Sequence, residues 1–303
     1  MKNQVKNHPV IAALLIVAAV FGLFVISVVV LVNLVGREHP YVTGAHVGVI
    51  EVSGLIADAK PIVDKLVEFR KDSDVKAVVV RIDSPGGEVG PSQEIYEEVL
   101  KTAKVKKVVA SLGGVAASGG YYIAVACSKI VSNPGTITGS IGVLVEFANV
   151  EGLLKKVGVE GDIVKAGAFK DMGSPLRRMT VQERAIVQGV LDSVHMQFIK
   201  AVAEGRRLPV ERVRAIADGR IMSGEQAKAA GLVDNLGNLQ DAIALAGKLG
   251  GIKGEAQAVY IKKNPYSLWK MLFEEDGASN LMQRLSPWAL RYVMPVATGY
   301  QIR

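Results

Sequence analysis

Short apolar runs alternate with amphipathic segments along most of this chain, and that alternation limits the possible folds more than any other feature. The run Lys76–Ile82 (KAVVVRI) is almost wholly apolar, as expected of a strand buried on both faces of a sheet. The later segment Ser92–Ala103 places its apolar residues on one side of a helix. Strands separated by helices pair in parallel, because the crossover returns the chain to the same end of the sheet. The sequence therefore predicts an α/β fold in which helices cover a parallel sheet.

The same patterns place the other elements. Two capping boxes, Thr180–Glu183 and Ser223–Gln226, mark helix starts. Asn238 can cap a helix over Leu239–Leu249. The segment Gly167–Met179 lacks apolar periodicity and is predicted to be a loop. Further strands are predicted at residues 46–52, 107–111, 129–132, 141–147, 162–166 and 256–261, and further helices at 61–70, 121–127 and 150–157.

The N-terminal region contains an uncharged stretch, Val10–Val32. Its 23 residues would form a helix of about 34 Å, which is long enough to span a bilayer core. Lys2 and Lys6 precede the stretch, whereas one arginine beside one glutamate follows it, so the positive-inside rule predicts a cytoplasmic N-terminus. A cleaved signal peptide is the alternative, but the stretch is longer than a usual signal-peptide core and no small-x-small cleavage site follows. We expect an uncleaved membrane anchor.

Charge and cysteine content exclude several classes of protein. The net charge is +7 and the sequence pI is near 9.3. Because the basic residues are spread out and accompany no nucleic-acid motif, we interpret them as a solvated surface and expect no nucleic-acid partner. The single cysteine, Cys127, can form neither an internal disulfide nor a cysteine-based zinc site. The four histidines are scattered and no carboxylates have the spacing of metal ligands, so neither metal nor cofactor is expected.

One stretch has the pattern of a catalytic turn. Residues 111–120 read SLGGVAASGG, after an apolar run and before the predicted helix at 121–127. A serine at a glycine-flanked junction of strand and helix is exposed to attack a substrate, and free N–H groups at the helix start point toward the same place. We take Ser118 as the candidate nucleophile. The alternative is that the Ser-Gly-Gly sequence is only a tight turn.

A serine nucleophile needs a base, and no histidine has a triad context. His195 is expected to be a packed or surface residue of the long helix. Lysine can serve instead if burial without a carboxylate partner keeps it neutral. Lys170 is the best candidate, since it lies in a loop with few charges, although the neighbouring Asp171 would have to point away. Lys165 is the second candidate, and an exposed loop lysine is the plainer interpretation of Lys170.

Four motifs in fixed order resemble one known family. They are DSPGG at 83–87, AASGGYYIA at 116–124, PGTITGSIGV at 134–143 and FKDMGSP at 169–175, followed by RIMSGEQAKAAGLVD at 220–234. Each is weak alone, but together they cover most of residues 45–260 and resemble the short, single-copy form of the signal peptide peptidase A (protease IV) family. The resemblance implies a Clp-protease/crotonase-like fold with repeated β-β-α units, preceded by one transmembrane helix.

The resemblance also implies roles for individual residues. Ser118 would be the nucleophile, Lys170 the general base and Ser140 the hydroxyl that orients the base. The N–H of Gly119 and that of either Gly86 or Gly87 would form the oxyanion hole, where one donor contributes about 3–4 kcal/mol to transition-state stabilisation. Taken alone, Ser140 is better explained as a strand-start cap and Gly86–Gly87 as part of a Pro-Gly turn.

These inferences predict a membrane-anchored serine endopeptidase that degrades cleaved signal peptides and other unfolded apolar peptides through an acyl-enzyme. A crotonase-type acyl-CoA enzyme and a non-catalytic membrane scaffold are the alternatives. The resemblance implies a homo-oligomer, an octamer, in the inner membrane. The cytoplasmic N-terminus predicted for the anchor places the catalytic domain outside the cytoplasm. The expected regions are a cytoplasmic N-terminus at 1–9, the anchor at 10–32, a linker at 33–45, the Ser/Lys peptidase domain at 46–262 and an amphipathic extension at 263–303.

Overall fold

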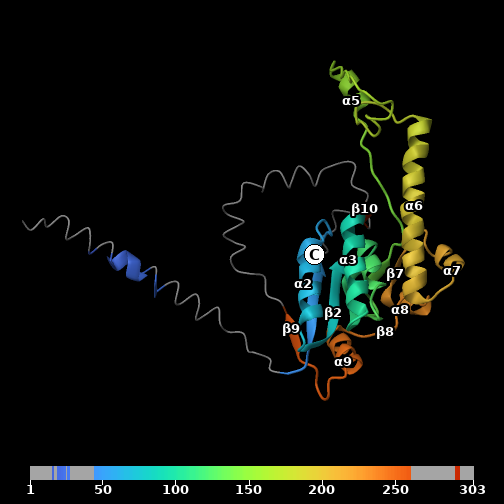
Figure 1. Cartoon of the computed structure of the whole chain (residues 1–303). Coiled ribbons are helices and arrows are strands. Elements are labelled where there is room, and N and C mark those ends of the chain that lie inside the picture. Colours follow the sequence, from blue (N-terminus) through green and yellow to red (C-terminus); the bar gives the residue numbers. More distant parts are fainter. Residues whose placement is uncertain (1–15, 17–18, 25, 28–43, 261–290, 294–303) are drawn as a thin grey trace, which may run out of the picture. The chain divides into compact units, whose positions relative to one another are not determined.

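The computed structural model describes residues 16, 19–24, 26–27, 44–260 and 291–293 (Figure 1). The chain divides into two units, Met1–Thr43 and Gly44–Arg303, and the second contains the sheet. The predicted anchor lies largely outside the described residues, and those described within it are helical. In the part of the chain that the structure describes, no helix combines the length and apolar character needed to cross a bilayer.

An eight-stranded sheet forms the centre of the second unit. Its main path runs β7-β6-β4-β2-β1-β9, with β5 paired to β4 and β8 paired to β5. All of these pairs are parallel except β6–β7. The prediction of a parallel α/β sheet is therefore confirmed. The strands are β1 (His46–Ser53), β2 (Val75–Ser84), β4 (Lys107–Ala117), β5 (Lys129–Ser132), β6 (Ile137–Gly139), β7 (Ile221–Ser223), β8 (Asn235–Leu236) and β9 (Ala258–Tyr260).

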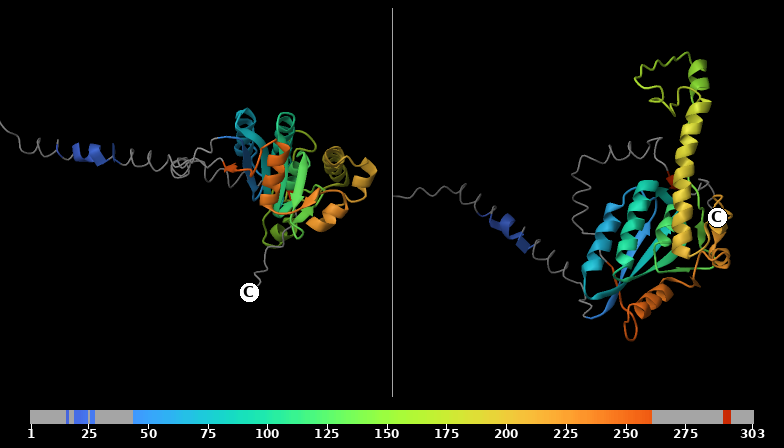
Figure 2. Two further views of the ribbon diagram at one scale, coloured as in Figure 1. Left: turned by 90° about the horizontal axis from the view of Figure 1, so that it is seen from below. Right: turned by 45° about the vertical axis from the view of Figure 1, so that its right-hand side comes forward.

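Helices cover both faces of the sheet (Figures 1 and 2). A separate two-stranded ladder joins β3 (Gly86–Glu88) to β10 (Arg291–Val293). The helices are α2 (Lys60–Lys71), α3 (Val89–Ala103), α4 (Gly119–Ala124), α5 (Glu151–Lys156), α6 (Val181–Arg206), α7 (Val210–Arg214), α8 (Gly224–Ala229) and α9 (Leu239–Leu249). The capping boxes at the starts of α6 and α8 are present as predicted, and Asn238 caps α9.

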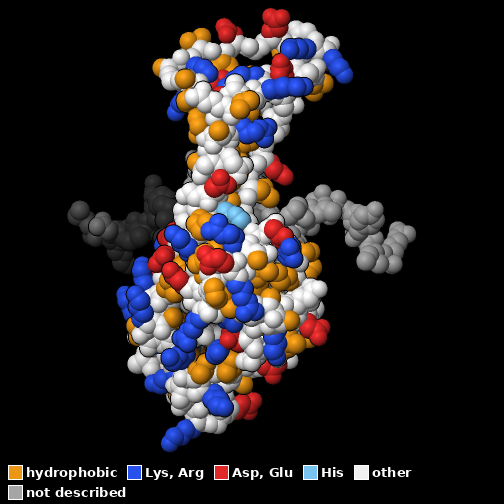
Figure 3. All heavy atoms as spheres, turned by 90° about the vertical axis from the view of Figure 1, so that its right-hand side faces the viewer, with side chains coloured by type: hydrophobic (Ala, Val, Ile, Leu, Met, Phe, Trp, Pro, Cys, Tyr) orange, Lys and Arg blue, Asp and Glu red, His pale blue; other side chains and the backbone are white. Residues whose placement is uncertain are grey.

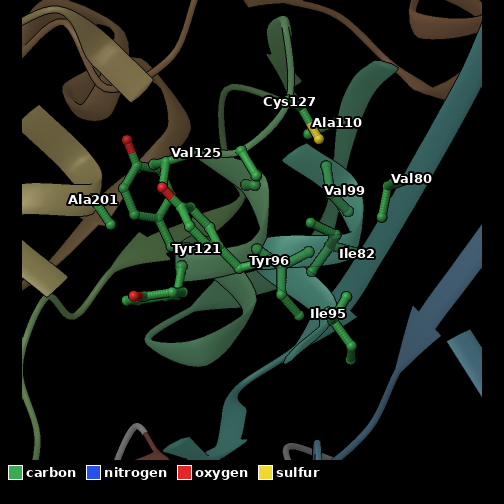
Figure 4. Close-up of a cluster of buried hydrophobic side chains, with 14 of the residues drawn as sticks. Val80, Ile82, Ile95, Tyr96, Val99, Ala110, Tyr121, Val125, Cys127 and Ala201 are labelled. Carbon is green, nitrogen blue, oxygen red and sulfur yellow. The ribbon is translucent and has the colours of Figure 1, made fainter. Parts of the chain in front are cut away.

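The side chains of β2 point alternately to the two faces of the sheet, and both faces are buried. Val78, Val80 and Ile82 belong to the larger core cluster, with residues of α2, α3, α4 and α6. Ala77 and Val79 point the other way, into a smaller cluster with α9. Because successive side chains of a strand face opposite sides, a continuous apolar run is what a doubly covered strand requires. Figure 4 shows part of the larger cluster, where Ile82 and Val99 lie between β2 and α3.

Two predicted strands are wrong. Residues 141–147 contain only a single bridge residue, Leu144, and of this segment only Ile141 is buried. Residues 162–166 are exposed and irregular. Both segments are rich in β-branched residues, but among the described residues neither contributes a strand to the eight-stranded sheet. The strand predicted at 107–111 is longer than expected and extends to Ala117 as β4.

α6 extends beyond the sheet. Its C-terminal half packs on α4, with the rings of Phe198 and Tyr122 4.9 Å apart. A Cβ on Gly205 would lie 2.1 Å from the Val125 carbonyl oxygen, so glycine permits this close crossing. The N-terminal half is open: Val181 is 88% exposed and Val190 46%. Figure 3 shows hydrophobic and basic side chains together on the lobe that α5 and the start of α6 form.

Candidate active site

Ser118 occupies the junction between β4 and α4, as predicted. Its φ of 54° and ψ of −119° are rarely adopted by residues other than glycine, and such a conformation costs about 1–3 kcal/mol. Two hydrogen bonds hold the turn: Ser118 N–H donates to Gly139 O at 2.9 Å, and Tyr122 N–H donates to Ser118 O at 2.8 Å. Ser118 is buried. Strain of this kind at a strand-to-helix serine is typical of a nucleophile.

Ser140 lies beside Ser118 at the same edge of the sheet. Ala117 of β4 pairs with Gly139 of β6, so the two serines follow neighbouring strand ends. Ser140 is buried, has a φ of 51°, and donates its N–H to Arg220 O at 2.8 Å. This is the carboxyl end of parallel strands, where α/β proteins place their binding sites. The structure therefore brings together two of the predicted site residues.

The Gly86–Gly87 turn belongs to the same edge. Ser84, at the end of β2, pairs with Ala116 of β4, and a Cβ on Gly120 would lie 3.1 Å from Ser84 O. Gly86 has a φ of 105° and donates its N–H to Ser84 Oγ at 3.1 Å. The N–H of Gly86 therefore already has an acceptor inside the turn.

Ile56 holds β3 from one side. Ile56 N–H donates to Gly86 O at 2.9 Å, and Glu88 N–H donates to Ile56 O at 2.7 Å. A Cβ on Gly87 would lie 2.0 Å from the Ile56 oxygen, which explains the glycine at this position. The other side of β3 pairs antiparallel with β10, where Tyr292 is opposite Gly87. One edge of β3 thus accepts an extended chain.

Lys170 lies elsewhere in this chain. It is exposed, in consecutive turns between α5 and α6, and its N–H donates to Gly167 O at 3.2 Å. The views in Figures 1 and 2 agree that this segment lies at the outer end of α6, whereas α4 packs on the inner half. Within the described residues, no hydrogen bond or ion pair joins Lys170 to Ser118 or Ser140. A single chain does not bring the predicted nucleophile and base together.

The residue after Lys170 is part of an ion-pair cluster, which we call the Arg177 cluster (Lys165, Asp171, Arg177 and Glu183). Arg177 Nε donates to Asp171 Oδ2 at 2.8 Å, and Arg177 Nη1 donates to Glu183 Oε2 at 2.8 Å. Hydrogen bonds from Arg177, then Lys165, hold the pKa of Asp171 below its usual range. Hydrogen bonds from Arg177, then from the Thr180 N–H, lower the pKa of Glu183 to about 2. The sequence revealed the capping role of Glu183, but not this cluster.

The other candidates have less suitable surroundings. Lys165 Nζ pairs with Asp171 and donates to Ala168 O at 2.9 Å, so it is already engaged. His195 lies on α6, and its Nε2 is buried without a hydrogen-bond partner among the described residues. Burial raises the pKa of the Cys127 thiol, which disfavours the reactive thiolate. Within the described ranges, no three His, Cys, Asp or Glu side chains are grouped to hold a metal ion.

Two protein-family models match parts of this chain. Residues 101–253 match the model of peptidase family S49, and residues 49–134 match that of Clp protease. The chain belongs to peptidase family S49. It is a serine peptidase, and the resemblance to the signal peptide peptidase A family is confirmed. The mixed α/β sheet agrees with a Clp-protease-like fold.

Relatives in this family differ in length. A Synechocystis protein named as a protease is 43% identical over 234 residues, which are 77% of this chain and 84% of that protein. Protease 4 of Salmonella typhi is 34% identical over 268 residues, which are 85% of this chain but 43% of that protein. The chloroplastic serine protease SPPA of Arabidopsis thaliana is 33% identical over 200 residues, which are 66% of this chain and 30% of that protein. The chain thus spans less than half of the latter two relatives.

Proposed function

We propose that this S49 peptidase is an endopeptidase with a Ser118/Lys170 dyad that degrades cleaved signal peptides and other unfolded apolar peptides. The observation that carries the proposal is the strained Ser118 at the carboxyl edge of the sheet, with Ser140 beside it and, at the same edge, the glycine strand β3, which pairs with an extended segment. Both matched family models describe peptidases, which favours this function over that of an acyl-CoA enzyme.

The reaction would proceed through an acyl-enzyme. Lys170 Nζ removes the proton from Ser118 Oγ, which attacks the scissile carbonyl carbon, and the same proton passes to the leaving amine. Water then hydrolyses the ester by the same route. Gly119 N–H and Gly87 N–H are the better oxyanion donors, because the N–H of Gly86 is bonded to Ser84 Oγ. Ser140 Oγ can orient the neutral amine of Lys170 without adding a charge.

An extended substrate would bind as an added strand on β3. The pairing of β10 with β3 supports this mode, because it places an antiparallel chain along Gly86–Glu88, next to the oxyanion donors. Strand addition of this kind uses main-chain hydrogen bonds and requires an unfolded segment. It therefore favours peptides and unfolded tails over folded proteins.

A second copy of the chain would supply the missing partner. The turns before α6 hold Lys170 at the outer end of that helix, away from Ser118, and the apolar stripe of the N-terminal half of α6 is exposed in one chain. A homo-oligomer, an octamer in this proposal, would cover that stripe and bring Lys170 of one subunit to Ser118 of another.

The proposed peptidase is anchored in a membrane. The uncharged stretch Val10–Val32 would anchor the chain in the inner membrane with residues 1–9 in the cytoplasm. Residues 33–45 would link it to a peptidase domain at 46–262 outside the cytoplasm, followed by an extension at 263–303. The orders β2–β3–α3 and β5–β6–α5 support an arrangement in repeated β-β-α units.

The test is peptidase activity of the full-length chain on an unfolded apolar peptide, with Ser118→Ala, Lys170→Ala and a matched control, Lys155→Ala. Lys155 is an exposed α5 lysine that pairs with Glu151. We expect Ser118→Ala and Lys170→Ala to abolish cleavage and the acyl adduct, and Lys155→Ala to retain both. Full activity in Lys170→Ala would place the base elsewhere. A folded, assembled parent without activity or adduct would favour the scaffold alternative.

A further inference from the structure

Asp171 follows Lys170 directly, and its carboxylate is the acid closest in sequence to the proposed base. A carboxylate that pairs with a lysine favours the charged form of the lysine, which cannot accept a proton. In the structure this carboxylate is bonded instead to Arg177 Nε, at 2.8 Å, and to Lys165 Nζ. The side chain of Asp171 is only 9% exposed. Its two cationic partners therefore occupy the acid that would otherwise be available to Lys170.

The same arginine reaches the start of α6. Arg177 Nη1 and Nη2 form a fork on the two carboxylate oxygens of Glu183, at 2.8 and 2.5 Å. Glu183 is also the acidic member of the capping box of α6, because it accepts the N–H of the N-cap residue Thr180 at 2.8 Å. Planar forks of this kind fix orientation as well as charge. Arg177 thus ties Asp171 to the first turn of a helix whose other end is packed in the core.

Other charged residues lie near Lys170 in the sequence, between α5 and the start of α6. The Arg177 cluster contains two cations and two carboxylates. Arg178 of the same segment and Arg184 of α6 form no ion pair among the described residues. From α5, Glu151 pairs with Lys155 at 2.7 Å. Glu160 and Asp162, earlier in the same exposed stretch, form no ion pair among the described residues. The acid directly adjacent to Lys170, Asp171, is held by two cations, whereas these more distant acids are not.

We propose that Arg177 is a positioning residue for the general base: it holds Asp171 at the start of α6, which fixes the peptide that carries Lys170 and keeps the Asp171 carboxylate from pairing with it. This inference rests on the proposed function, because it requires Lys170 to be the base.

The test is the pH dependence of kcat/KM in the full-length chain. In Arg177→Gln, Asp171 keeps only Lys165 as a cationic partner and loses its link to Glu183, so it can also pair with Lys170. We therefore expect the acid limb of the pH profile to move up by about one pH unit. At neutral pH, kcat/KM should fall about tenfold and recover at higher pH. The double variant Asp171→Asn/Arg177→Gln should return the limb to its original position, because the freed carboxylate is gone. Arg178→Gln is the matched control: it removes an equal charge from an exposed neighbour and should leave the limb unchanged.

An unshifted limb in Arg177→Gln would overturn the proposal, as would equal losses at all pH values in the single and double variants. Lys170→Ala, measured in parallel, separates the two hypotheses. If Lys170→Ala is inactive while the Arg177→Gln limb is unshifted, only the positioning role fails. If Lys170→Ala is fully active, the base assignment fails. Should Arg177→Gln not assemble, Arg177→Lys keeps the charge but cannot form the fork that joins Asp171 to Glu183, so a smaller shift in the same direction is expected.

Discussion

At the scale of single residues, the backbone conformation of Ser118 lowers the stability of the fold but positions the serine hydroxyl. Its positive φ places the hydroxyl at the edge of the sheet, and a side chain at that φ costs free energy that glycine would not. Its neighbour across the ladder, Ser140, has the same feature. Two adjacent strand ends therefore hold serines where the backbone geometry favours glycine, which argues that the hydroxyls are needed.

We predict that the free energy of unfolding of Ser118→Gly is about 1 kcal/mol higher than that of Ser118→Ala, since glycine relieves the backbone strain and alanine does not. Both variants should be inactive, and denaturant titration measures the difference. The same pair of substitutions at Ser73, an exposed serine whose φ is not positive, should not favour glycine. Equal stabilities of the two Ser118 variants would show that the turn relaxes around any side chain.

At the scale of elements, β3 depends on its close approach to Ile56. We predict that Gly87→Ala reduces peptidase activity at least tenfold, because a Cβ 2.0 Å from the Ile56 oxygen would push β3 off its neighbour and displace an oxyanion donor. Gly90→Ala is the control, since a Cβ there meets nothing within 4 Å, and it should retain activity. Steady-state kinetics with a far-UV spectrum of each variant distinguish a displaced strand from a lost fold.

Another contact between elements predicts a pH dependence of stability. Asp234 accepts from Arg206 of α6 at 2.8 Å and from Lys129 and the Ile130 N–H of β5 at 3.0 and 2.8 Å. Burial acts to raise the pKa of Asp234, but these hydrogen bonds outweigh it, so the pKa lies below its usual value of 3.8. The carboxylate therefore stabilises the fold fully above that value, and the stabilisation is lost as the pH falls below it.

We expect the free energy of unfolding to fall between about pH 5 and 3, as the Asp234 carboxylate is protonated, and to fall by less in Asp234→Asn. Urea titration at each pH measures this. Asp64→Asn, which removes an exposed carboxylate of α2, serves as the control and should keep the steeper fall. A wild-type slope in Asp234→Asn would assign the acid sensitivity to other carboxylates.

At the scale of the whole molecule, the proposed site needs two chains. We predict that Ser118→Ala and Lys170→Ala, each inactive alone, recover part of the activity when their subunits are mixed and reassembled. Mixed assemblies contain some sites with an intact serine from one variant and an intact lysine from the other. Each variant reassembled alone is the control. No recovery, with exchange of subunits demonstrated, would mean that both residues act within one chain.

The sequence alone was sufficient for features that depend on local chemistry. Alternation predicted strand β1, and an apolar run predicted the buried strand β2. The capping boxes, in which the side chains of the first and fourth residues bond back to the main chain, predicted the starts of α6 and α8. Ser118 was identifiable because glycines flank it at a strand-to-helix junction. These signals are encoded within a few residues, so no knowledge of distant parts of the chain was required.

Only the tertiary structure decided which distant residues meet. β-branched residues at 141–147 and 162–166 favour strands, yet neither segment joins the eight-stranded sheet in the part of the chain that the structure describes. The pairing of β10 with β3 joins residues about two hundred positions apart, and the fork of Arg177 on Glu183 depends on how the segment turns back onto α6. Ladders and ion pairs depend on separation in space. The sequence pattern therefore predicted most of the elements and a candidate nucleophile, whereas packing determined the surroundings of Ser118 and the position of Lys170.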